Sequence, residues 1–344
     1  MTSVQIGVSG LGSIGCRHAR LLAGMPGVEV HGFDSHGVSD AAAAELGGLT
    51  SIAPSLDALI ERAPTGLIVA TPDAVHVEQA ELAVRAGVPV LIEKPLSNDL
   101  VSAQAITDLA AAQGVPAMVG YVLRHHGTMR RLQRVIAGGD IGAPASVHAT
   151  LSAYETLVVA RNRFDDDATY RLVFDYSHEW DYLQWLFGPI VRCAATSRVA
   201  PGVRPSQTPN VVDVLFDFET DLTGSVHLDY VSPGVRRCRV IGEEGVVEMD
   251  IATGSIVIKP HGGDEQSETV REERDVAFVR QLEHFVEVAQ GRAEPIVSLR
   301  DGVNAIAVAD ALVVACTERR WVDVSSVPGR GDAEPQIPPT RRSE

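Results

Sequence analysis

The first 120 residues of the chain alternate short apolar runs with segments in which apolar residues recur at helical spacing. The apolar runs predict buried strands, and the spaced segments predict helices, mostly of about 10–15 residues. The predicted strands are residues 4–9, 28–33, 66–70, 88–92 and 116–120, and the predicted helices are residues 16–24, 41–46, 75–86 and 98–113. Strands that alternate with helices indicate βαβ units and a doubly wound parallel sheet.

The pattern changes after about residue 122. Apolar and polar residues alternate along the later strands, which predicts an open, mostly antiparallel sheet with one exposed face. The predicted strands are residues 145–154, 211–218, 224–231, 237–241, 246–251 and 255–258, and the predicted helices are residues 128–137, 176–187, 280–289 and 301–318. The last helices can cover one face of the sheet. Part of the other face is expected to pack on a second subunit, in a homodimer or homotetramer.

The expected fold class is therefore α/β with two domains. Residues 1–122 are expected to form a nucleotide-binding domain, and residues 123–327 an α+β domain for substrate binding and oligomerisation. Residues 328–344 are rich in proline, arginine and acidic residues, a composition that predicts a disordered tail.

Charge and cysteine content narrow the possible partners. The 344 residues include 29 Lys and Arg against 45 Asp and Glu, a formal net charge of −16. This balance argues against nucleic-acid and anionic-membrane partners, which need clustered basic side chains. No apolar run approaches the ~20 residues of a membrane span, and the N-terminus lacks a secretion signal. The spacing of the four cysteines and of the histidines predicts neither a disulfide framework nor a metal site, so a cytoplasmic enzyme is expected.

A glycine motif, Gly10-Leu-Gly12-Ser13-Ile14-Gly15, directly follows the first predicted strand and opens a helix. In a dinucleotide-binding loop, Gly10 would make the tight turn, Gly12 would let the backbone approach pyrophosphate, and Gly15 would allow close helix packing. The helix N-terminus would face the phosphates with its free N–H groups. The alternative interpretation is a plain glycine turn, but the strand–loop–helix context favours a Rossmann nucleotide site.

Asp34 ends the second predicted strand, 19 residues after Gly15. A carboxylate at this position can accept hydrogen bonds from the ribose hydroxyls of adenosine and repels a 2′-phosphate. No arginine follows Asp34 directly. The sequence therefore favours NAD over NADP, although Asp34 could also be an ordinary turn residue.

Lys94 follows the apolar strand that ends at Glu93, and Pro95 follows Lys94. Ligands bind at the carboxyl ends of the strands in such sheets, so Lys94 is expected where nicotinamide and substrate meet. In a partly dry pocket a lysine can have a lowered pKa and transfer protons. The alternative is a solvated lysine after a strand.

Four segments occur in an order that resembles the Gfo/Idh/MocA family of sugar and cyclitol oxidoreductases. These segments are GLGSIG at 10–15, ATPDAVHVEQA at 70–80, EKPLS at 93–97 and DYSHEWDYLQWLFG at 175–188. The resemblance extends over about residues 3–325, and its most diagnostic part is the EKP sequence together with His178-x-x-Asp181. It implies that His178 is the proton acceptor or donor for the reacting hydroxyl, a role that suits a group with a near-neutral pKa.

Asp175 departs from the family pattern. In the family that this chain resembles, many members have the motif D-x-x-x-H, in which the aspartate assists the lysine. Here Asp175 lies three residues before His178, and Phe174 lies four residues before it. Asp175 is therefore expected either to contact substrate or to be an N-cap of the His178 helix, with Ser177 as a rival cap.

The remaining candidate contacts come from the same segments. We expect the catalytic residues to be Lys94, His178 and Asp175. The expected cofactor-binding residues are Gly10, Gly12, Ser13, Ile14, Gly15, Asp34, Ala70, Thr71, Pro72, His76, Glu93 and Lys94. The expected substrate-binding residues are Lys94, Tyr121, Arg124, Tyr154, Arg163, Asp175, His178 and Asp181. Alternatives remain for some of them, because the arginines could be surface charges and His76 could be a residue of a helix face.

The sequence hypothesis is hydride transfer between NAD and a secondary alcohol of a sugar, cyclitol or sugar derivative, with Lys94 and His178 in proton transfer. One alternative is an NAD-dependent glycosidase that oxidises its substrate only transiently. The other is a non-catalytic regulatory subunit that binds NAD.

Overall fold

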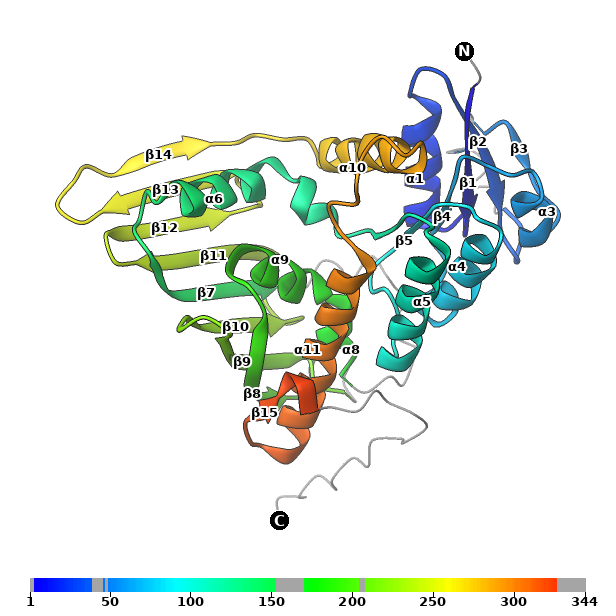
Figure 1. The fold of residues 1–344 in the computed structure, drawn as a ribbon. Coiled ribbons are helices and arrows are strands. Elements are labelled where there is room, and N and C mark those ends of the chain that lie inside the picture. Colours follow the sequence, from blue (N-terminus) through cyan, green and yellow to red (C-terminus); the bar gives the residue numbers. More distant parts are fainter. Residues whose placement is uncertain (1–2, 39–45, 47–48, 153–169, 204–207, 327–344) are drawn as a thin grey trace. The chain divides into compact units, whose positions relative to one another are not determined.

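The computed structural model describes residues 3–38, 46, 49–152, 170–203 and 208–326, and these residues divide into two compact units (Figure 1). The first unit comprises residues 1–126 and 272–306, and the second comprises residues 127–271 and 307–344. Each unit is described by itself. The first unit extends to residue 126 rather than to the expected boundary at residue 122. It also includes residues 272–306, which were expected in the second domain. The predicted tail and nearly all of the predicted helix at 41–46 lie outside the described residues.

The first unit contains a six-stranded parallel sheet with the order β3-β2-β1-β4-β5-β6. Its strands are β1 (Val4–Ser9), β2 (Val28–Phe33), β3 (Ser51–Ile52), β4 (Gly66–Val69), β5 (Val90–Ile92) and β6 (Ala117–Val119). The strand order reverses between β1 and β4, which are neighbours in the sheet. Ser9 pairs with Val69, and Val69 pairs with Ile92, so three strands end side by side. The predicted doubly wound sheet is confirmed, and these strand ends form the edge where such sheets bind ligands.

The helical elements of the first unit differ at their ends from the predicted ones. They are α1 (Ser13–Ala23), α3 (Leu56–Ile60), η1 (Asp73–Val75), α4 (His76–Arg85), α5 (Leu100–Gln113), η2 (Val122–His125) and α10 (Arg274–Ala289). The helix expected at 16–24 begins at Ser13, directly after Gly12. The helix expected at 75–86 is preceded by the short 3₁₀ turn η1. The amide of Val88 still bonds to the carbonyl of Ala83, so β5 begins two residues later than predicted.

Helix α10 belongs to the first unit because its apolar face completes that unit's core. Leu282, Phe285 and Val288 are buried in one cluster with Ile6, Val8 and Leu22. A Cβ atom on Gly66 would lie 2.8 Å from the ring of Phe285, so the glycine at the start of β4 makes room for that ring. Asp275 at the other end of α10 pairs with Arg20 on α1 at 2.7 Å. Packing that links residues so distant in sequence is not visible in local periodicity.

The second unit contains a nine-stranded sheet with the order β14-β13-β12-β11-β7-β10-β9-β8-β15 among the described residues. Its strands are β7 (Pro144–Ser152), β8 (Ile190–Arg198), β9 (Val211–Phe218), β10 (Thr223–Asp229), β11 (Val235–Gly242), β12 (Gly245–Asp250), β13 (Ser255–Pro260), β14 (Gln266–Thr269) and β15 (Val322–Asp323). Only the β7–β10 pair is parallel in this sheet. The predicted open, mostly antiparallel sheet is therefore confirmed.

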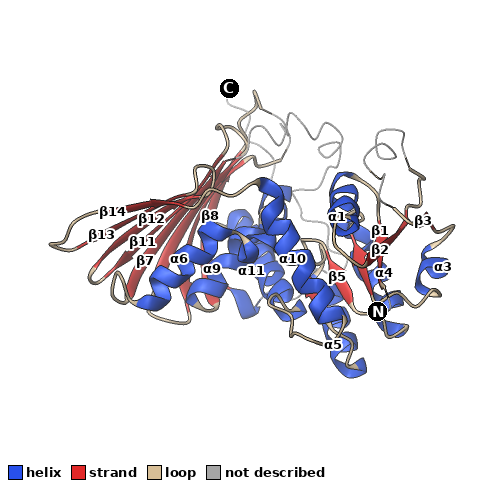
Figure 2. Ribbon diagram, turned by 90° about the horizontal axis from the view of Figure 1, so that it is seen from above, coloured by secondary structure: helices blue, strands red, loops and turns tan. Residues whose placement is uncertain are grey.

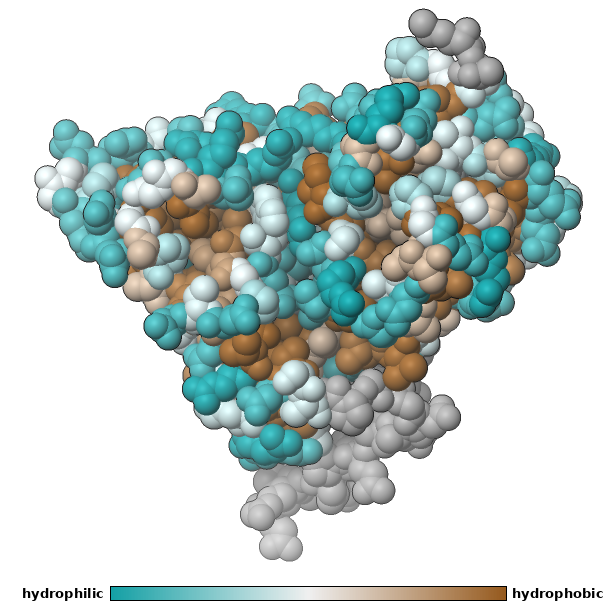
Figure 3. All heavy atoms as spheres, in the orientation of Figure 1, coloured by the Kyte–Doolittle hydropathy of each residue, from teal (hydrophilic) through white to brown (hydrophobic). Residues whose placement is uncertain are grey.

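The helical elements of the second unit are α6 (Gly127–Gly138), α8 (Arg171–Asp175), α9 (Ser177–Phe187) and η3 (Val324–Ser326), and α11 (Leu299–Glu318) begins in the first unit and ends in the second. Figure 2 shows α6 and α9 against one face of the sheet. The opposite face carries ion pairs such as Arg237–Asp250 at 2.7 Å, next to a few apolar side chains such as Leu215, which is 54% exposed. Figure 3 shows a hydrophilic surface at the β14 end, where all four strand residues are exposed.

Candidate functional site

The glycine loop between β1 and α1 leaves no space for side chains at two of its three glycines. Gly10 has a φ of +86°, and a Cβ atom there would lie 2.7 Å from the backbone of Ala70 and Thr71. A Cβ on Gly15 would lie 1.8 Å from the carbonyl oxygen of Gly10. A Cβ on Gly12, in contrast, would meet no atom within 4 Å. The loop thus packs tightly against β4 and opens outward only at Gly12, where a ligand can approach the backbone.

The N-terminus of α1 is suited to a negatively charged ligand. Gly12 is the N-cap and has no side chain that could bond to the amides of the first turn. Ser13 and Ile14 begin the helix, and the first turn holds no acidic residue that would repel an anion. Free N–H groups and the positive end of the helix dipole make such a terminus a phosphate-binding site. The residues present therefore fit a dinucleotide pyrophosphate.

Asp34 lies at the end of β2 and helps to hold the loop. One carboxylate oxygen accepts a hydrogen bond from the amide of Leu11 at 2.7 Å, and the other accepts one from the amide of His36 at 2.8 Å. Each carboxylate oxygen has more than one acceptor site, so both remain able to bind ribose hydroxyls. Asp34 therefore joins the end of β2 to the glycine loop.

His76 ties the ends of β4 and β5 together. Its Nδ1 lies 2.9 Å from the carbonyl oxygen of Pro95, and its Nε2 lies 2.8 Å from the carbonyl oxygen of Thr71. The ring is buried, and the Lys94–Pro95 peptide bond beside it is cis. Sequence reasoning proposed His76 as a cofactor contact. In the structure both ring nitrogens face backbone carbonyls, so His76 positions the strand-end segments that contain Ala70, Pro72 and Lys94.

Glu93 is buried just before Lys94 and pairs with His18 on α1. Its Oε1 lies 2.7 Å from Nε2 of His18, and its Oε2 accepts a hydrogen bond from the amide of Lys94 at 3.2 Å. Burial alone would raise the pKa of Glu93. The hydrogen bond from His18 and the charges of His18 and Lys94 outweigh burial, and this pKa lies below its ordinary value. Sequence reasoning gave no role to His18, although it follows Gly15 by three residues.

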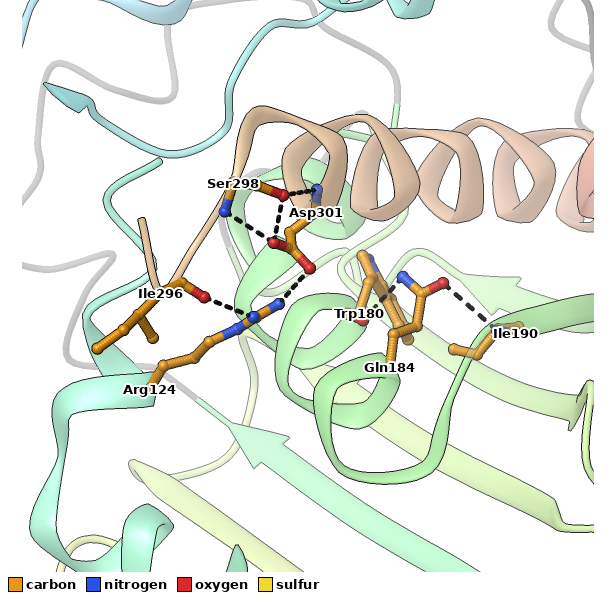
Figure 4. Close-up of polar contacts among 7 residues, drawn as sticks. All are labelled: Arg124, Trp180, Gln184, Ile190, Ile296, Ser298 and Asp301. Carbon is orange, nitrogen blue, oxygen red and sulfur yellow. Dashed lines mark hydrogen bonds and ion pairs between the residues drawn. The ribbon is translucent and has the colours of Figure 1, made fainter. Parts of the chain in front are cut away.

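Arg124 is held inside the first unit, at the start of α11 (Figure 4). Its guanidinium donates to Asp301 at 2.9 Å and to the carbonyl oxygen of Ile296 at 3.1 Å, and the residue is only 6% exposed. Ser298 and Asp301 bond to each other in a capping box, which begins the helix. Arg124 is therefore a buried residue of the first unit, which excludes the alternative that it is a surface charge, while its substrate contact stays a prediction. Tyr121, another predicted contact, is also fully buried.

The His178 segment of the second unit consists of two short helices. Asp175 ends α8, where it pairs with Arg171 at 2.9 Å and accepts a hydrogen bond from the hydroxyl of Tyr230 at 3.2 Å. Burial and the charge of Asp175 raise the pKa of Tyr230 well above its ordinary value. The N-cap of α9 is Tyr176. The capping role considered for Asp175, and for Ser177 as its rival, is therefore wrong, because Asp175 ends α8 and Ser177 is already the first residue of α9.

Helix α9 is anchored firmly to its surroundings. The indole N–H of Trp180 donates to the carbonyl oxygen of Val173 at 2.8 Å. Glu179 is buried and lies 2.9 Å from Arg236 on β11. In Figure 4, Gln184 connects the carbonyl of Trp180 with the amide of Ile190. These contacts fix the helix that carries half-buried His178 and fully buried Asp181.

Some predicted sites cannot be placed. Tyr154 and Arg163 lie outside the described residues. Lys94 belongs to the first unit and His178 to the second. Within the described ranges no cluster of three His, Cys, Asp or Glu residues is arranged to hold a metal ion. The described helices also include none with the length and hydropathy needed to cross a membrane.

Two family models match the chain. The oxidoreductase family model with an NAD-binding Rossmann fold matches residues 4–121, and the GFO/IDH/MocA C-terminal domain model matches residues 129–248. The first match contains the glycine loop and Lys94, and the second contains His178. The chain thus carries an NAD-binding Rossmann domain.

Similar proteins have names that refer to cyclitols and sugars. Inositol 2-dehydrogenase of Mycolicibacterium gilvum is 28% identical over 305 residues, which cover 83% of each chain. D-apiose dehydrogenase of Paraburkholderia graminis is 26% identical over 291 residues, covering 77% of this chain and 74% of its own. The crystal structure of scyllo-inositol dehydrogenase from Lactobacillus casei, with bound NAD(H) and scyllo-inositol, has a TM-score of 0.79. It covers 94% of this chain and 100% of its own at 19% identity, so it shows a shared fold.

Substitutions at two of the loop glycines should separate folding from cofactor binding. In Gly12→Ala, we expect an unchanged Tm and a loss of NAD affinity of about tenfold or more, because the methyl group occupies the ligand's approach. In Gly15→Ala, the clash with Gly10 should also lower Tm by about 2–4 °C or more. Calorimetry and thermal unfolding measure both effects. Gly202→Ala, at an exposed position with open space, is the matched control. NAD binding by Gly12→Ala at wild-type affinity would contradict this model of the loop.

Proposed function

The chain belongs to the Gfo/Idh/MocA oxidoreductase family, and on this premise we propose that it uses NAD to oxidise a secondary alcohol of a sugar, cyclitol or related derivative, or to reduce the corresponding ketone. The observation that carries the proposal lies at one sheet edge. There the glycine loop opens at Gly12, and Lys94 follows the end of a strand in the same row of strand ends. The names of the relatives support a polyhydroxylated substrate.

Residues of the first unit would hold the cofactor. The amides at the start of α1 would bind the pyrophosphate, and Asp34 would bind the ribose hydroxyls of adenosine. The carboxylate of Asp34 would repel a 2′-phosphate, which favours NAD over NADP. When bound, the nicotinamide ring supplies the hydride chemistry of the reaction.

Proton transfer at the reacting hydroxyl is assigned to Lys94 and His178. A side chain that removes the hydroxyl proton needs a pKa near the working pH, and both residue types can meet this requirement. Asp181 would orient the substrate from the same helix as His178. Asp175 would act from the end of α8, where Arg171 and Tyr230 hold its carboxylate in place.

The part of the open face of the second unit's sheet around Leu215 on β9 is proposed as the contact surface of a homodimer or homotetramer. Leu215 is exposed there, in a sheet whose other face is packed against helices. Light scattering should give two or four times the 36.7 kDa chain mass, and Leu215→Arg should shift the protein toward the monomer. A wild-type protein that is monomeric at micromolar concentration would contradict this proposal.

The activity is tested by NADH absorbance with NAD and a panel of inositols, free sugars, sugar acids and nucleotide sugars. With an active substrate, we expect Lys94→Ala and His178→Ala each to lower kcat by about 10²-fold or more, because each removes a proton-transfer group. NAD affinity measured by calorimetry should change much less. Lys259→Ala is the matched control, since Lys259 lies half-exposed on β13.

Two outcomes would overturn this assignment. Full turnover by both variants would exclude the proton-transfer roles. NAD binding without net NADH formation across the whole panel would instead favour transient oxidation or a regulatory role.

A further inference from the structure

A charged group is buried at the end of β5, next to the proposed proton-transfer lysine. Glu93 is 7% exposed, and its carboxylate is bound on two sides: by the His18 ring at 2.7 Å and by the backbone amide of Lys94 at 3.2 Å. The third side is the backbone of Gly120, the residue directly after β6. A Cβ atom on Gly120 would lie 2.9 Å from Oε1 of Glu93, so the missing side chain at Gly120 makes room for the carboxylate.

His18 is locked in the orientation that serves Glu93. It belongs to α1, the helix that begins at the glycine loop, and its side chain is fully buried. A carboxylate only accepts hydrogen bonds, so Nε2 of His18 carries the proton that is donated. The ring packs edge-on against Phe278 of α10 with the centroids 5.8 Å apart. Asp275 of α10 forms ion pairs with Arg17 and Arg20, which lie before and after His18 in α1.

The pairing keeps Glu93 ionised inside the protein. An unpaired buried carboxylate would take up a proton, whereas one bound by two donors keeps its charge. That negative charge is next to Lys94 in the chain and interacts electrostatically with it. The surrounding elements carry other titratable and charged residues, among them Asp73 in η1, His76 and Glu81 on α4, Tyr121 after β6 and, in η2, Arg124 and His125. Glu93 is the acid next to Lys94 in the chain.

We propose that Glu93 and His18 form a positioning pair, which fixes the backbone of Lys94 and sets the pH at which its side chain gives up a proton. The inference rests on the proposed function in that Lys94 is taken as the proton-transfer group. It adds that the pKa of Lys94 is influenced from helix α1, through the fully buried side chain of His18. The folding of the glycine loop and the pH at which Lys94 loses its proton would then depend on the same buried contact between His18 and Glu93.

The chain offers an unusually direct test, because its only lysines are Lys94 and Lys259. Competitive acetylation with acetic anhydride between about pH 6 and pH 11, followed by mass spectrometry of the two peptides, gives a titration midpoint for each lysine without substrate or cofactor. Lys259 lies half-exposed on the second unit and serves as the internal reference.

In Glu93→Gln, we expect the midpoint of Lys94 to fall by about one pH unit, because the neutral amide no longer stabilises the ammonium form. His18→Phe should shift it in the same direction, since the carboxylate loses its donor and favours protonation. His18→Gln retains an N–H donor and should restore most of the wild-type midpoint. Glu81→Gln, at a half-exposed position of α4 where Glu81 pairs with Arg85, is the acid control and should leave the midpoint of Lys94 unchanged. The pH profile of turnover should move with the labelling midpoint.

An unchanged Lys94 midpoint in Glu93→Gln would overturn the proposal, as would an equal shift in Glu81→Gln. If Glu93→Gln does not fold, the proposal is tested by comparing the Lys94 midpoints of His18→Phe and His18→Gln. Equal midpoints in these two variants would contradict the proposed Glu93–His18 pair. Labelling needs no turnover. A midpoint shift in a protein that is inactive on every substrate would therefore reject the proposed function and retain the positioning pair.

Discussion

The backbone of Gly10 lies so close to the end of β4 that no side chain fits between them, and much of the first unit depends on this contact. It sets the turn from β1 into α1 and leaves Gly12 as the loop position open to a ligand. Asp34 bonds to the same loop from the end of β2, and His76 joins the end of β4 to the segment after Lys94. The ends of the four strands β1, β2, β4 and β5 are thereby fixed by short hydrogen bonds and close backbone packing.

A second set of contacts passes through the protein interior. The N-terminus of helix α1 is the proposed phosphate site and, three residues after Gly15, the helix buries His18 against Glu93. In this proposal one helix contributes both to cofactor binding and to the position of Lys94. In the second unit, two buried contacts fix the helix that carries His178. They are the Glu179–Arg236 ion pair and the hydrogen bond from Trp180 to the carbonyl of Val173. In both units, buried polar contacts fix elements that bear the proposed reactive groups.

The sequence predicted features that depend on neighbouring residues. The glycine motif, the parallel strands and the alternating strands of the second sheet follow from local periodicity and turn chemistry. Features that join distant residues were not predictable in this way. Arg124 pairs with Asp301, 177 residues away, and His18 pairs with Glu93, 75 residues away. Helix α10 was assigned to the wrong unit for the same reason. The capping alternative considered for Asp175 is wrong because α8, which ends at Asp175, was not predicted.

The central claim is that Lys94 and His178 transfer the proton of one substrate hydroxyl, while the glycine loop binds the pyrophosphate of the nicotinamide cofactor. A crystal structure of the complex with NADH and the substrate identified by turnover tests it most directly. We expect Nζ of Lys94 and a ring nitrogen of His178 each to lie about 3 Å from the same substrate oxygen, with the pyrophosphate at the start of α1. A complex in which the oxygen at the reacting carbon contacts neither side chain would contradict the account.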